Sequence, residues 1–551
     1  MTPRHLATVP AAVLATALVA APVAAQPAAP PVPAPPVPAP SLPAPPVPAP
    51  SLPAPDAYQP PEFITAPPAL PPSVDPAEAW QLELIEAIRL AVRNNLDVVL
   101  EREAVTIADR GVDLAVGERE PTLGARYRHG DVRTPSSSVL EGSPDTINTS
   151  VGDAVALSYQ QRFATGLTLG ADFDLARDRS TSSAAVADLN VRSTATLRVT
   201  QPLLRGFSTD LVVPRLAILR AKLGSARARG QLEVVLADVV LRTETAYWDV
   251  VAALYRHDLA VRSASRAEAQ LALTTRQIEA GVLPPSDRIS AEGTLAQRQL
   301  QQVQAEQAVD AAWDRLRAVM NLPRPEWRRA IVPVERPSFA PGAQSLDDAL
   351  AAALRNRPEP AQLASDVADA ELGVREARNA RLPQLDLGVS GTLIGQAERT
   401  GASLRDLGGA DARGWTVMLD LTWTPLSRRA DAALAIERSR EAQRVTQRDA
   451  ALQRIWIEVK DAVRAQDGAA REVAAAARFR QLAEDGLALE ERRFLNGTSS
   501  NFLIAQRQEE LAAAQVAELT ALLDHQKALA TRLHATGALL TERGIAVTPA
   551  P

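Results

Sequence analysis

Cysteine is absent from this chain of 551 residues, and histidine is scarce, with five in total. A chain without cysteine forms no disulfide, carries no lipidated N-terminal cysteine and offers no thiolate to a metal. Four of the histidines are dispersed and form no ligand cluster: His129, His257, His525 and His534. We therefore expect no metal site, no cofactor and no catalytic residues built on these side chains.

Aromatic residues and excess positive charge are also lacking. Aromatics make up 4% of the chain, and the formal net charge is −6. No Lys/Arg cluster is interleaved with aromatics, which argues against a nucleic-acid-binding protein. The sequence shows no Gly-rich phosphate loop and no nucleophile elbow, and its carboxylates have the spacing of solvated helix faces. These absences weigh against a secreted enzyme.

Long hydrophobic runs are missing beyond the N-terminus. Arg4 and His5 precede an apolar run over residues 9–20, and Val23-Ala24-Ala25 fits a cleavage site before Gln26. This pattern predicts a signal peptide over residues 1–25. No later run reaches the ~20 apolar residues that a membrane-spanning helix needs. We expect the mature chain to be exported and not anchored by a helix.

Residues 26–79 form a Pro/Ala-rich low-complexity segment, in which residues 33–42 recur identically at 43–52. Proline fixes φ and removes a donor, so such a tract favours solvated polyproline II. Two interpretations stay open: a spacer that spans or contacts the cell wall, and a tolerated disordered extension. Order is expected to begin near Asp75-Pro76, an N-cap followed by proline.

An internal repeat organises the rest of the chain. Residues 84–121 match residues 346–383 at a constant offset of 262, including Arg93-Asn94 with Arg355-Asn356. Each copy predicts two helices and a proline stop. A period this long indicates a duplicated domain. We expect repeats over residues 80–341 and 342–541, with a C-terminal tail at 542–551.

After each proline stop the apolar period changes from 3.6 to 2, which is typical of strands. The alternation is clearest at residues 123–127, 167–175, 195–199, 385–389 and 415–423, and about six strands are expected within 122–201 and 384–425. Ser/Asp/Gly-rich stretches at 133–150, 178–190 and 396–413 are interpreted as hairpin loops. Both regions end in similar sequences, at Pro202-Leu203 and Pro425-Leu426.

Two very long helical zones follow, because proline is absent from residues 215–283 and 426–548. A helix of about 70 residues is roughly 100 Å long. Each zone has one break, at residues 281–287 and at residues 496–501, and a shorter helix follows it. Glycine at the break and Ser or Asn after it suit a helix end and a new N-cap. Two antiparallel helical hairpins are predicted.

Exported half-apolar strands indicate a β-barrel in the outer membrane. Single-chain barrels have at least eight strands, and an open edge is not tolerated in lipid. Closure by several copies is therefore expected. Trp415 and Trp423 share a strand face about 26 Å apart, close to the spacing of two aromatic girdles. The alternative is that both lie in the core of a soluble sheet.

The twofold order of helix, helix, strands, long helix, tip and return helix resembles the TolC-type outer-membrane efflux protein family over residues 80–541. The resemblance is carried by LELIEAIRLAVRNN and LDDALAAALRNRPE, by LRVTQPLLRGF and LDLTWTPLSRR, and by the tips GVLPPSD and GTSSNF with LAQRQL and IAQRQEE downstream. It implies a mainly α fold with a transmembrane β part, as a homotrimer with a 12-stranded β-barrel continuous with a 12-helix α-barrel.

The same resemblance implies a function. The chain would be the passive exit duct of a tripartite efflux pump or type I secretion system, located in the outer membrane, in contact with its lipid and extending into the periplasm. Its partners would be a periplasmic adaptor and an inner-membrane transporter, with small molecules or proteins as cargo. The alternative is a periplasmic coiled-coil adaptor or scaffold.

The hairpin tips are the implied docking and gating site. By position, the tip residues are Gly281, Asp287, Phe494, Gly497, Ser499, Ser500 and Asn501. Asp287 is expected either to contact the other hairpin or to cap its own helix. Family members with an acidic ring carry carboxylates after the second tip, whereas this chain has Asn501 and an apolar run there. Where Tyr and Arg lock the gate, it has Phe494 and Ser499.

Overall fold

A computed structural model describes residues 58, 60–72, 74–75, 79–135, 147–181, 189–339, 342, 345–496 and 498–546. The described residues belong to one compact unit, Ala54–Pro551. The expected signal peptide, most of the Pro/Ala-rich segment and the end of the tail lie outside them.

The elements follow the repeat. The first half contains α1 (Glu62–Thr65), β1 (Trp80–Leu82), α2 (Leu84–Asn94), α3 (Leu96–Gly117), β2 (Thr122–Pro135), β3 (Ile147–Arg162), β4 (Thr168–Ser180), β5 (Leu189–Pro202), η2 (Val213–Arg215), α4 (Leu216–Glu279), α5 (Ser286–Met320), η3 (Arg324–Arg328) and β6 (Ile331–Pro333). The second half contains α6 (Leu346–Asn356), α7 (Glu359–Ala380), β7 (Gln384–Ala397), α8 (Thr400–Gly409), β8 (Ala412–Thr422), α9 (Arg428–Leu495), α10 (Asn501–Ala535) and α11 (Leu539–Glu542). Both ends of α2 and α6 differ by 262, the offset of the sequence repeat.

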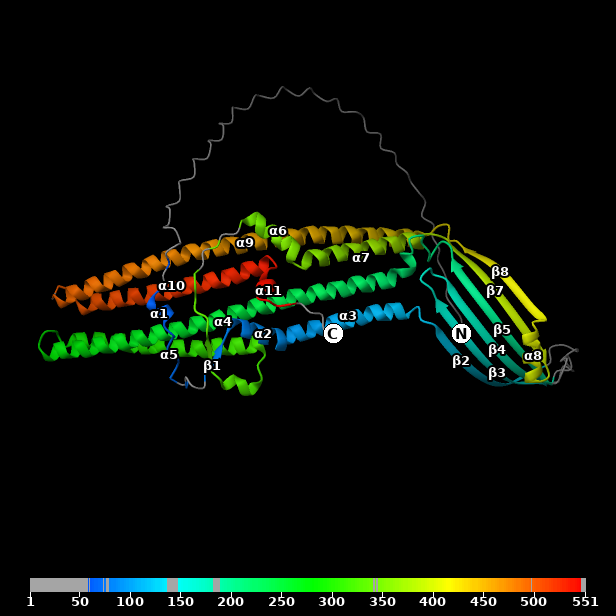
Figure 1. The fold of residues 1–551 in the computed structure, drawn as a ribbon, viewed down its shortest axis with the longest axis horizontal. Coiled ribbons are helices and arrows are strands. Elements are labelled where there is room, and N and C mark those ends of the chain that lie inside the picture. Colours follow the sequence, from blue (N-terminus) through cyan, green and yellow to red (C-terminus); the bar gives the residue numbers. More distant parts are fainter. Residues whose placement is uncertain are drawn as a thin grey trace, which may run out of the picture. The chain divides into compact units, whose positions relative to one another are not determined.

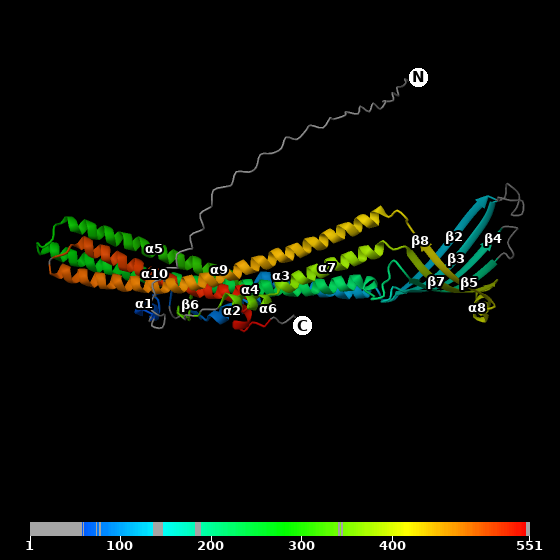
Figure 2. The same ribbon diagram turned by 90° about the horizontal axis from the view of Figure 1, so that it is seen from above.

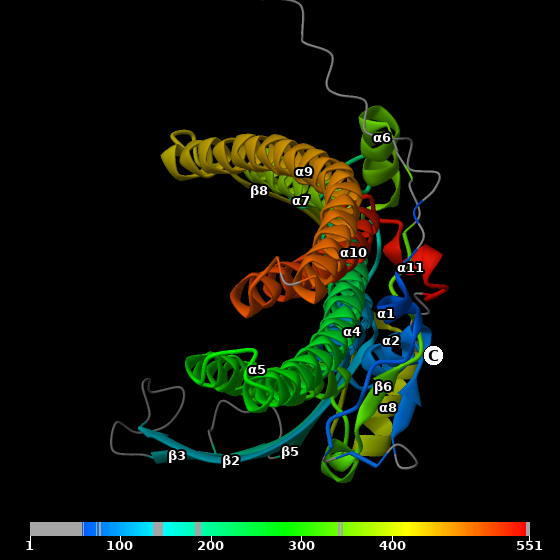
Figure 3. The same cartoon turned by 90° about the vertical axis from the view of Figure 1, so that its left-hand side faces the viewer.

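The long helices lie side by side. In the half of the helices nearest the sheet the order is α3, α4, α7, α9; towards the tips it is α5, α4, α10, α9. Figure 1 shows the sheet beyond one end of α3, α4, α7 and α9, and the two hairpin tips at the far ends of α4 and α9. Figure 2 shows the same arrangement from above. Figure 3, seen along the helices, shows α9, α10, α4 and α5 as one curved layer. None of the described helices is both long and apolar enough to cross a membrane.

The main sheet has six strands in the order β2-β3-β4-β5-β7-β8, all antiparallel. Its register places one apolar row across all strands: Leu123, Tyr159, Ala171, Leu197, Gly391 and Trp415. The next row, on the other face, is small and polar: Gly124, Ser158, Asp172, Thr196, Thr392 and Gly414. The sheet therefore has one apolar and one polar face, as period-2 alternation requires.

The expected strand count of about six is confirmed, but the position of one strand and one of the expected loops need correction. Much of β3 was not recognised, because Ala154 and Ala156 on its second face blur the alternation with Val155 and Leu157. Within the expected loop 396–413, Thr400–Gly409 form α8. This helix lies against the apolar face of the sheet, where Ser403 of α8 contacts Ser193 of β5. The Oγ of Ser193 donates to the Ser403 carbonyl at 2.9 Å.

The strand count also affects the implied barrel. In a 12-stranded barrel formed by three copies of a chain, each copy supplies four strands. This chain has six strands in one continuous ladder. The additional strands are neither an external hairpin nor a split strand, since β3 and β4 pair along their length with β2 and β5.

Order begins earlier than Asp75-Pro76, and this expectation was wrong. Residues 60–72, here called the N-terminal strap, pack on the helices with Phe63 and Ile64 buried. The Tyr255 hydroxyl donates to the Ile64 carbonyl at 2.8 Å, and the Ala69 amide donates to Asp258 at 3.2 Å. The first helix of the repeat, α2, begins at Leu84. Leu82 belongs to β1, which pairs with β6 in a small parallel sheet.

A buried histidine lies beside this strap. His525 of α10 is 1% exposed, and neither ring nitrogen has a partner among the described residues. Its ring lies 5.0 Å from that of Phe339, which packs on Tyr58. The neighbouring charges are paired, Glu518 with Arg480 and Lys527 with Asp249. Burial lowers the pKa of His525 below its usual 6.5.

We expect acidification from about pH 7.5 to about pH 5 to destabilise the chain through His525. Between pH 6.5 and the lowered pKa of the folded state, His525 is protonated in the unfolded state and neutral in the folded state. The free energy of unfolding therefore falls by up to about 1.4 kcal/mol per pH unit as the pH falls through that window. His525→Phe should remove this part of the pH dependence of the thermal unfolding midpoint. Burial raises the pKa of Glu518, so this residue changes the stability in the opposite direction as the pH falls. The Glu518 contribution is present in both the wild type and His525→Phe, and it cancels when the two are compared.

His534→Gln is the matched control, since His534 is paired with Asp238 at 2.8 Å and should leave the His525 contribution in place. Equal pH dependence of the wild type and His525→Phe would contradict the assignment.

Candidate functional site at the hairpin tips

The first tip ends α4 with a Schellman motif. Gly281 has φ +73°, its amide donates to Ile278 at 3.0 Å, and the Val282 amide donates to Gln277 at 2.8 Å. A left-handed residue at this position favours glycine. The helix break predicted at Gly281 is therefore present, directly after the C-cap of α4, Ala280. Helix α5 starts five residues after Gly281, at Ser286.

The second tip is closed by side chains. Ser500 is the N-cap of α10 and accepts from the Leu503 amide. The Thr498 hydroxyl donates to the Arg493 carbonyl at 3.0 Å, and Ser499 donates to the buried carboxylate of Glu490 at 2.5 Å. Gly497 and the Asn501 side chain lie outside the described residues. Ser499 thus fastens its own hairpin, and Phe494 is half-buried on the same hairpin.

Polar contacts join the two hairpins along their seam. Starting from the middle of the helices, α4 and α10 are linked by Asp238 with His534 at 2.8 Å, by Asp249 with Lys527 at 2.5 Å and by Arg256 with Thr520 at 3.1 Å. Nearer the tips, Arg298 of α5 forms an ion pair with Glu509 of α10. Arg298 is almost fully buried, whereas Glu509 is half-exposed.

Beyond that ion pair the seam encloses a cavity of about 170 Å³. It is lined mostly by small polar side chains of both hairpins, among them Gln270, Thr274, Asp287, Ser290, Thr294, Ser500 and Gln508. Thr274 is 1% exposed, and its hydroxyl has no partner among the described residues. A buried unpaired hydroxyl costs about 1–3 kcal/mol, so a polar guest in this cavity would be stabilised.

Of the two roles expected for Asp287, the cap of its own helix is absent, and the contact with the other hairpin stays a prediction. The N-cap of α5 is Pro285, and the Asp287 side chain is not a cap. Instead, Asp287 and Ser500 line the same cavity from opposite hairpins. Of the tip residues named from the sequence, these two line the cavity, whereas Phe494 and Ser499 do not.

Sequence reasoning missed Arg298 and Glu509. Both belong to the strings LAQRQL and IAQRQEE, which lie at matching places after the two tips. Arg298 and Arg507 are therefore equivalent, but Arg507 pairs within its own helix, with Glu510 at 2.5 Å. An arginine repeated at equivalent places on the two hairpins, with glutamates after only one of them, was the available signal for an inter-hairpin contact.

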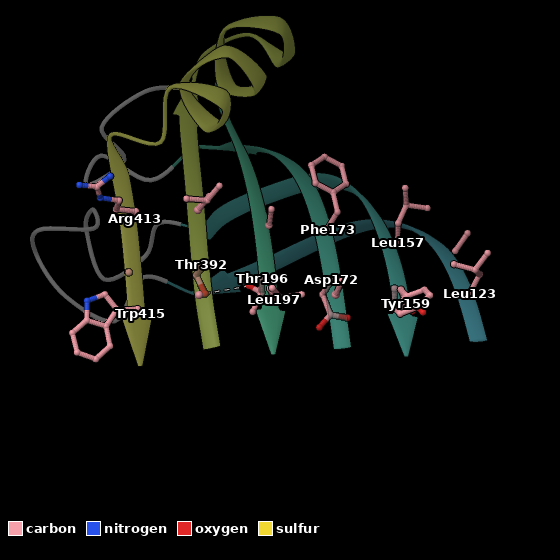
Figure 4. Close-up of a pocket in the computed structure, with 18 residues that line it drawn as sticks. Leu123, Leu157, Tyr159, Asp172, Phe173, Thr196, Leu197, Thr392, Arg413 and Trp415 are labelled. Atoms are coloured by element: carbon pink, nitrogen blue, oxygen red, sulfur yellow. Dashed lines mark hydrogen bonds between the residues drawn. The ribbon is translucent and has the colours of Figure 1, made fainter. Parts of the chain in front are cut away.

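The sheet carries a second candidate surface. Side chains of all six strands surround an open concavity of about 850 Å³, which Figure 4 shows. Trp415 lies on its rim and is 80% exposed, and Trp423, one residue past β8, is 64% exposed. Neither tryptophan is part of a core within this chain. Their placement in two aromatic girdles stays a prediction.

Metal chemistry finds no support in the side-chain geometry. Over the described part of the chain, no three His, Asp or Glu side chains are grouped so that they could hold a metal ion. The tip cavity has one carboxylate, that of Asp287, among neutral hydroxyl and amide groups. It suits hydrogen-bonded or cationic guests more than a divalent ion, which prefers several carboxylates.

The inter-hairpin ion pair is testable without any assay of function. We expect Arg298→Met to separate the tips, because a hydrogen bond between charged groups contributes about 1.5–3 kcal/mol. Since the chain has no cysteine, nitroxides on Ile289→Cys and Phe502→Cys report the distance directly by pulsed electron resonance. Arg288→Met is the control, because Arg288 pairs within its own helix with Glu292. An unchanged distance distribution in Arg298→Met would rule out this role.

Comparison with known proteins gives the fold a context. No family model matches the sequence, and no curated protein matches it. Among solved structures, a membrane protein from Pseudomonas aeruginosa is 18% identical with a TM-score of 0.60, covering 87% of this chain and 96% of that one. The outer-membrane channel OprN is 15% identical with a TM-score of 0.61, covering 87% and 95%.

The Campylobacter jejuni CmeC outer membrane channel is 13% identical with a TM-score of 0.61, covering 83% of this chain and 86% of that one. Identities this low establish similarity of fold. The likeness nevertheless extends over nearly the whole length of each channel, and it confirms at the level of the fold the resemblance seen in the sequence. The chain has the fold of the TolC-type outer-membrane efflux channels.

Proposed function

We propose that this protein is the passive outer-membrane exit duct of a tripartite efflux pump or type I secretion system. The observation that carries the proposal is the joining of a two-faced sheet to long helices. Four strands connect directly to four helices of the layer: α3 to β2, β5 to α4, α7 to β7 and β8 to α9. Such a chain can line one continuous passage across a membrane and the space beside it.

The apolar face of the sheet supports contact with outer-membrane lipid. Leu123, Leu197, Val389, Val417 and Leu421 lie on that face and are all exposed in the single chain. Exposed apolar area on this scale marks a surface that is covered by lipid or protein. The polar face, with Asp172, Thr196 and Thr392, then faces a water-filled lumen.

The edges of the sheet and of the helix layer support assembly of several copies, and the resemblance implies a homotrimer. β2 and β8 each lack a neighbour on one side within the described sheet, and they run in opposite directions. β2 of one copy can therefore pair with β8 of the next. Beside them, α3 carries an exposed stripe of Leu100, Ile107 and Leu114 at a spacing of seven residues. Four helices per chain give twelve in three copies, as the resemblance implies.

The hairpin tips are the proposed contact with a periplasmic adaptor, which in turn joins an inner-membrane transporter. The cavity between the hairpins supports this, because it is polar, lies at the tips and is lined by both hairpins. A cationic or hydroxyl side chain of a partner could hydrogen-bond Asp287 and Thr274. Cargo would be small molecules or proteins that cross without chemical change, so the chain is not an enzyme.

The alternative of a periplasmic adaptor or scaffold is disfavoured. Two solved proteins that share this fold over most of its length, OprN and CmeC, are outer-membrane channels. An adaptor would also have no use for a sheet whose apolar face and two edges are uncovered. Extraction without detergent would be its sign.

We expect the detergent-extracted protein to have the mass of three copies by light scattering. Replacing Leu100, Ile107 and Leu114 together by serine should abolish the trimer, since burial of each such side chain contributes about 1.5–3 kcal/mol. Leu404→Ser on α8 is the control, because Leu404 is an exposed leucine outside the helix layer. A monomeric wild type, or its recovery in the soluble fraction without detergent, would contradict the proposal.

The composition of the second tip leads to a prediction about ion selectivity. With Asn501 and an apolar run in place of carboxylates, the tip lacks an acidic ring at those positions and can close by dewetting. In a trimer, Asn501→Asp adds three negative charges at a narrow site, so the pore should become more cation-selective and more readily blocked by a trivalent cation. Planar-bilayer conductance measures both effects. A wild type blocked as strongly as the variant would mean that other residues form an acidic ring.

A further inference from the structure

Two strands of the sheet have no helix attached. β2, β5, β7 and β8 each continue into the helix layer, whereas β3 and β4 are joined to each other by the turn at residues 163–167 on the helix side of the sheet. Four helix-linked strands per chain account for a barrel of twelve in three copies. The β3–β4 hairpin is additional to that set.

The hairpin is built as part of the sheet wall. Its register with β2 runs from Thr122 opposite Gln160 to Pro135 opposite Ile147, and its register with β5 from Thr168 opposite Thr200 to Arg179 opposite Leu189. Its large apolar residues share the apolar face of the sheet: Val155, Leu157, Tyr159, Leu169, Phe173 and Leu175. A plug inside the lumen would neither pair along both edges nor match this face.

The turn of the hairpin is fixed at the junction of sheet and helices. Gly166 has φ +85°, and a Cβ there would lie 3.2 Å from the Pro202 ring and 3.3 Å from the Gly206 carbonyl oxygen. The Gln201 side chain donates to the Thr165 carbonyl at 3.2 Å. The hairpin therefore spans the full height of the sheet and ends against the corner between β5 and α4.

We propose that three copies of this chain close an eighteen-stranded barrel, six strands from each, on the twelve-helix layer. The proposal rests on the trimeric exit duct argued above and changes its outer-membrane part. The contact that closes the ring is β2 of one copy against β8 of the next. Each added hairpin keeps β2 and β5 antiparallel to their neighbours, so no edge is created in the lipid.

The widths of the two layers agree with this number. Strands about 4.8 Å apart and tilted by about 40° enclose a backbone circle about 24 Å across for twelve strands and about 36 Å for eighteen. Twelve parallel helices spaced about 8–10 Å apart form a ring about 31–38 Å across. Eighteen strands thus continue the helix layer at nearly constant width, whereas twelve require a strong taper.

A barrel of eighteen strands leaves an open aqueous channel of the kind found in 16–18-stranded porins. In this protein the outer-membrane section would then impose little limit on the size of the cargo. The hairpin tips would be the narrow point, and the β3–β4 hairpin would be the element that sets the width of the exit.

Electron cryomicroscopy of the full chain in lipid nanodiscs tests the proposal by counting strands in the membrane section. We expect threefold symmetry and eighteen strands. Deletion of residues 147–181 removes the hairpin and joins β2 to β5 through the remaining loop residues, which should give twelve strands and a barrel narrower by a factor of about 1.5, since diameter grows linearly with strand number. Disulfide trapping between single cysteines on β2 and β8 should yield a covalent trimer.

The outcomes separate this proposal from the function on which it rests. A conducting trimer with twelve membrane strands would overturn the eighteen-stranded barrel and leave the exit duct intact. A dimer with twelve strands would overturn both the barrel and the trimer. If the deletion variant does not fold, the strand count of the wild type still decides.

Discussion

The paired edges of the sheet are the constraint on which the rest of the structure depends. A strand in lipid must bond every backbone group to protein, and this chain leaves one side of β2 and one side of β8 without a partner in the described sheet. Six strands are too few to close alone. For the proposed outer-membrane duct, assembly is therefore a condition of membrane insertion. The exposed apolar stripe on α3, which precedes β2, likewise needs a partner chain to cover it in the helix layer.

The seam between the two hairpins divides the helix layer into a tighter and a looser part. Around the strap and the small β1–β6 sheet, buried side chains of α2, α4, α5 and α10 form one large core, and ion pairs join α4 to α10. Towards the tips the core shrinks to small clusters, and the seam ends in one ion pair and a polar cavity. Few apolar contacts and a polar seam permit movement at low free-energy cost. Opening of the passage is thus expected at the tips, with the middle of the helices held fixed.

Much of this arrangement could be predicted from the sequence, because it depends on the period of the apolar residues and on the proline and glycine residues that end helices. The change from period 3.6 to period 2 located the sheet, and the glycine of the first tip located the end of α4. The remainder depends on contacts between distant residues. The strap is a low-complexity segment whose Phe63 and Ile64 happen to fit the core. Arg298 and Arg507 occupy equivalent strings, yet only the former reaches the other hairpin. β3 was hidden because alanine is compatible with either face of a strand.

The two halves of the chain diverged in the sheet and not in the helix layer, and geometry explains the asymmetry. A helix added to the layer must find a complementary groove on each side and a new connection along its whole length. A β-hairpin needs matching backbone edges and an alternation of side chains that fits the two faces of the sheet. Strands can be added only in pairs, since one extra strand would reverse the direction of β5 and place α4 at the wrong end of the sheet. In the proposed ring of three copies, one hairpin inserted in each chain therefore enlarges the barrel by six strands and leaves every helix in place.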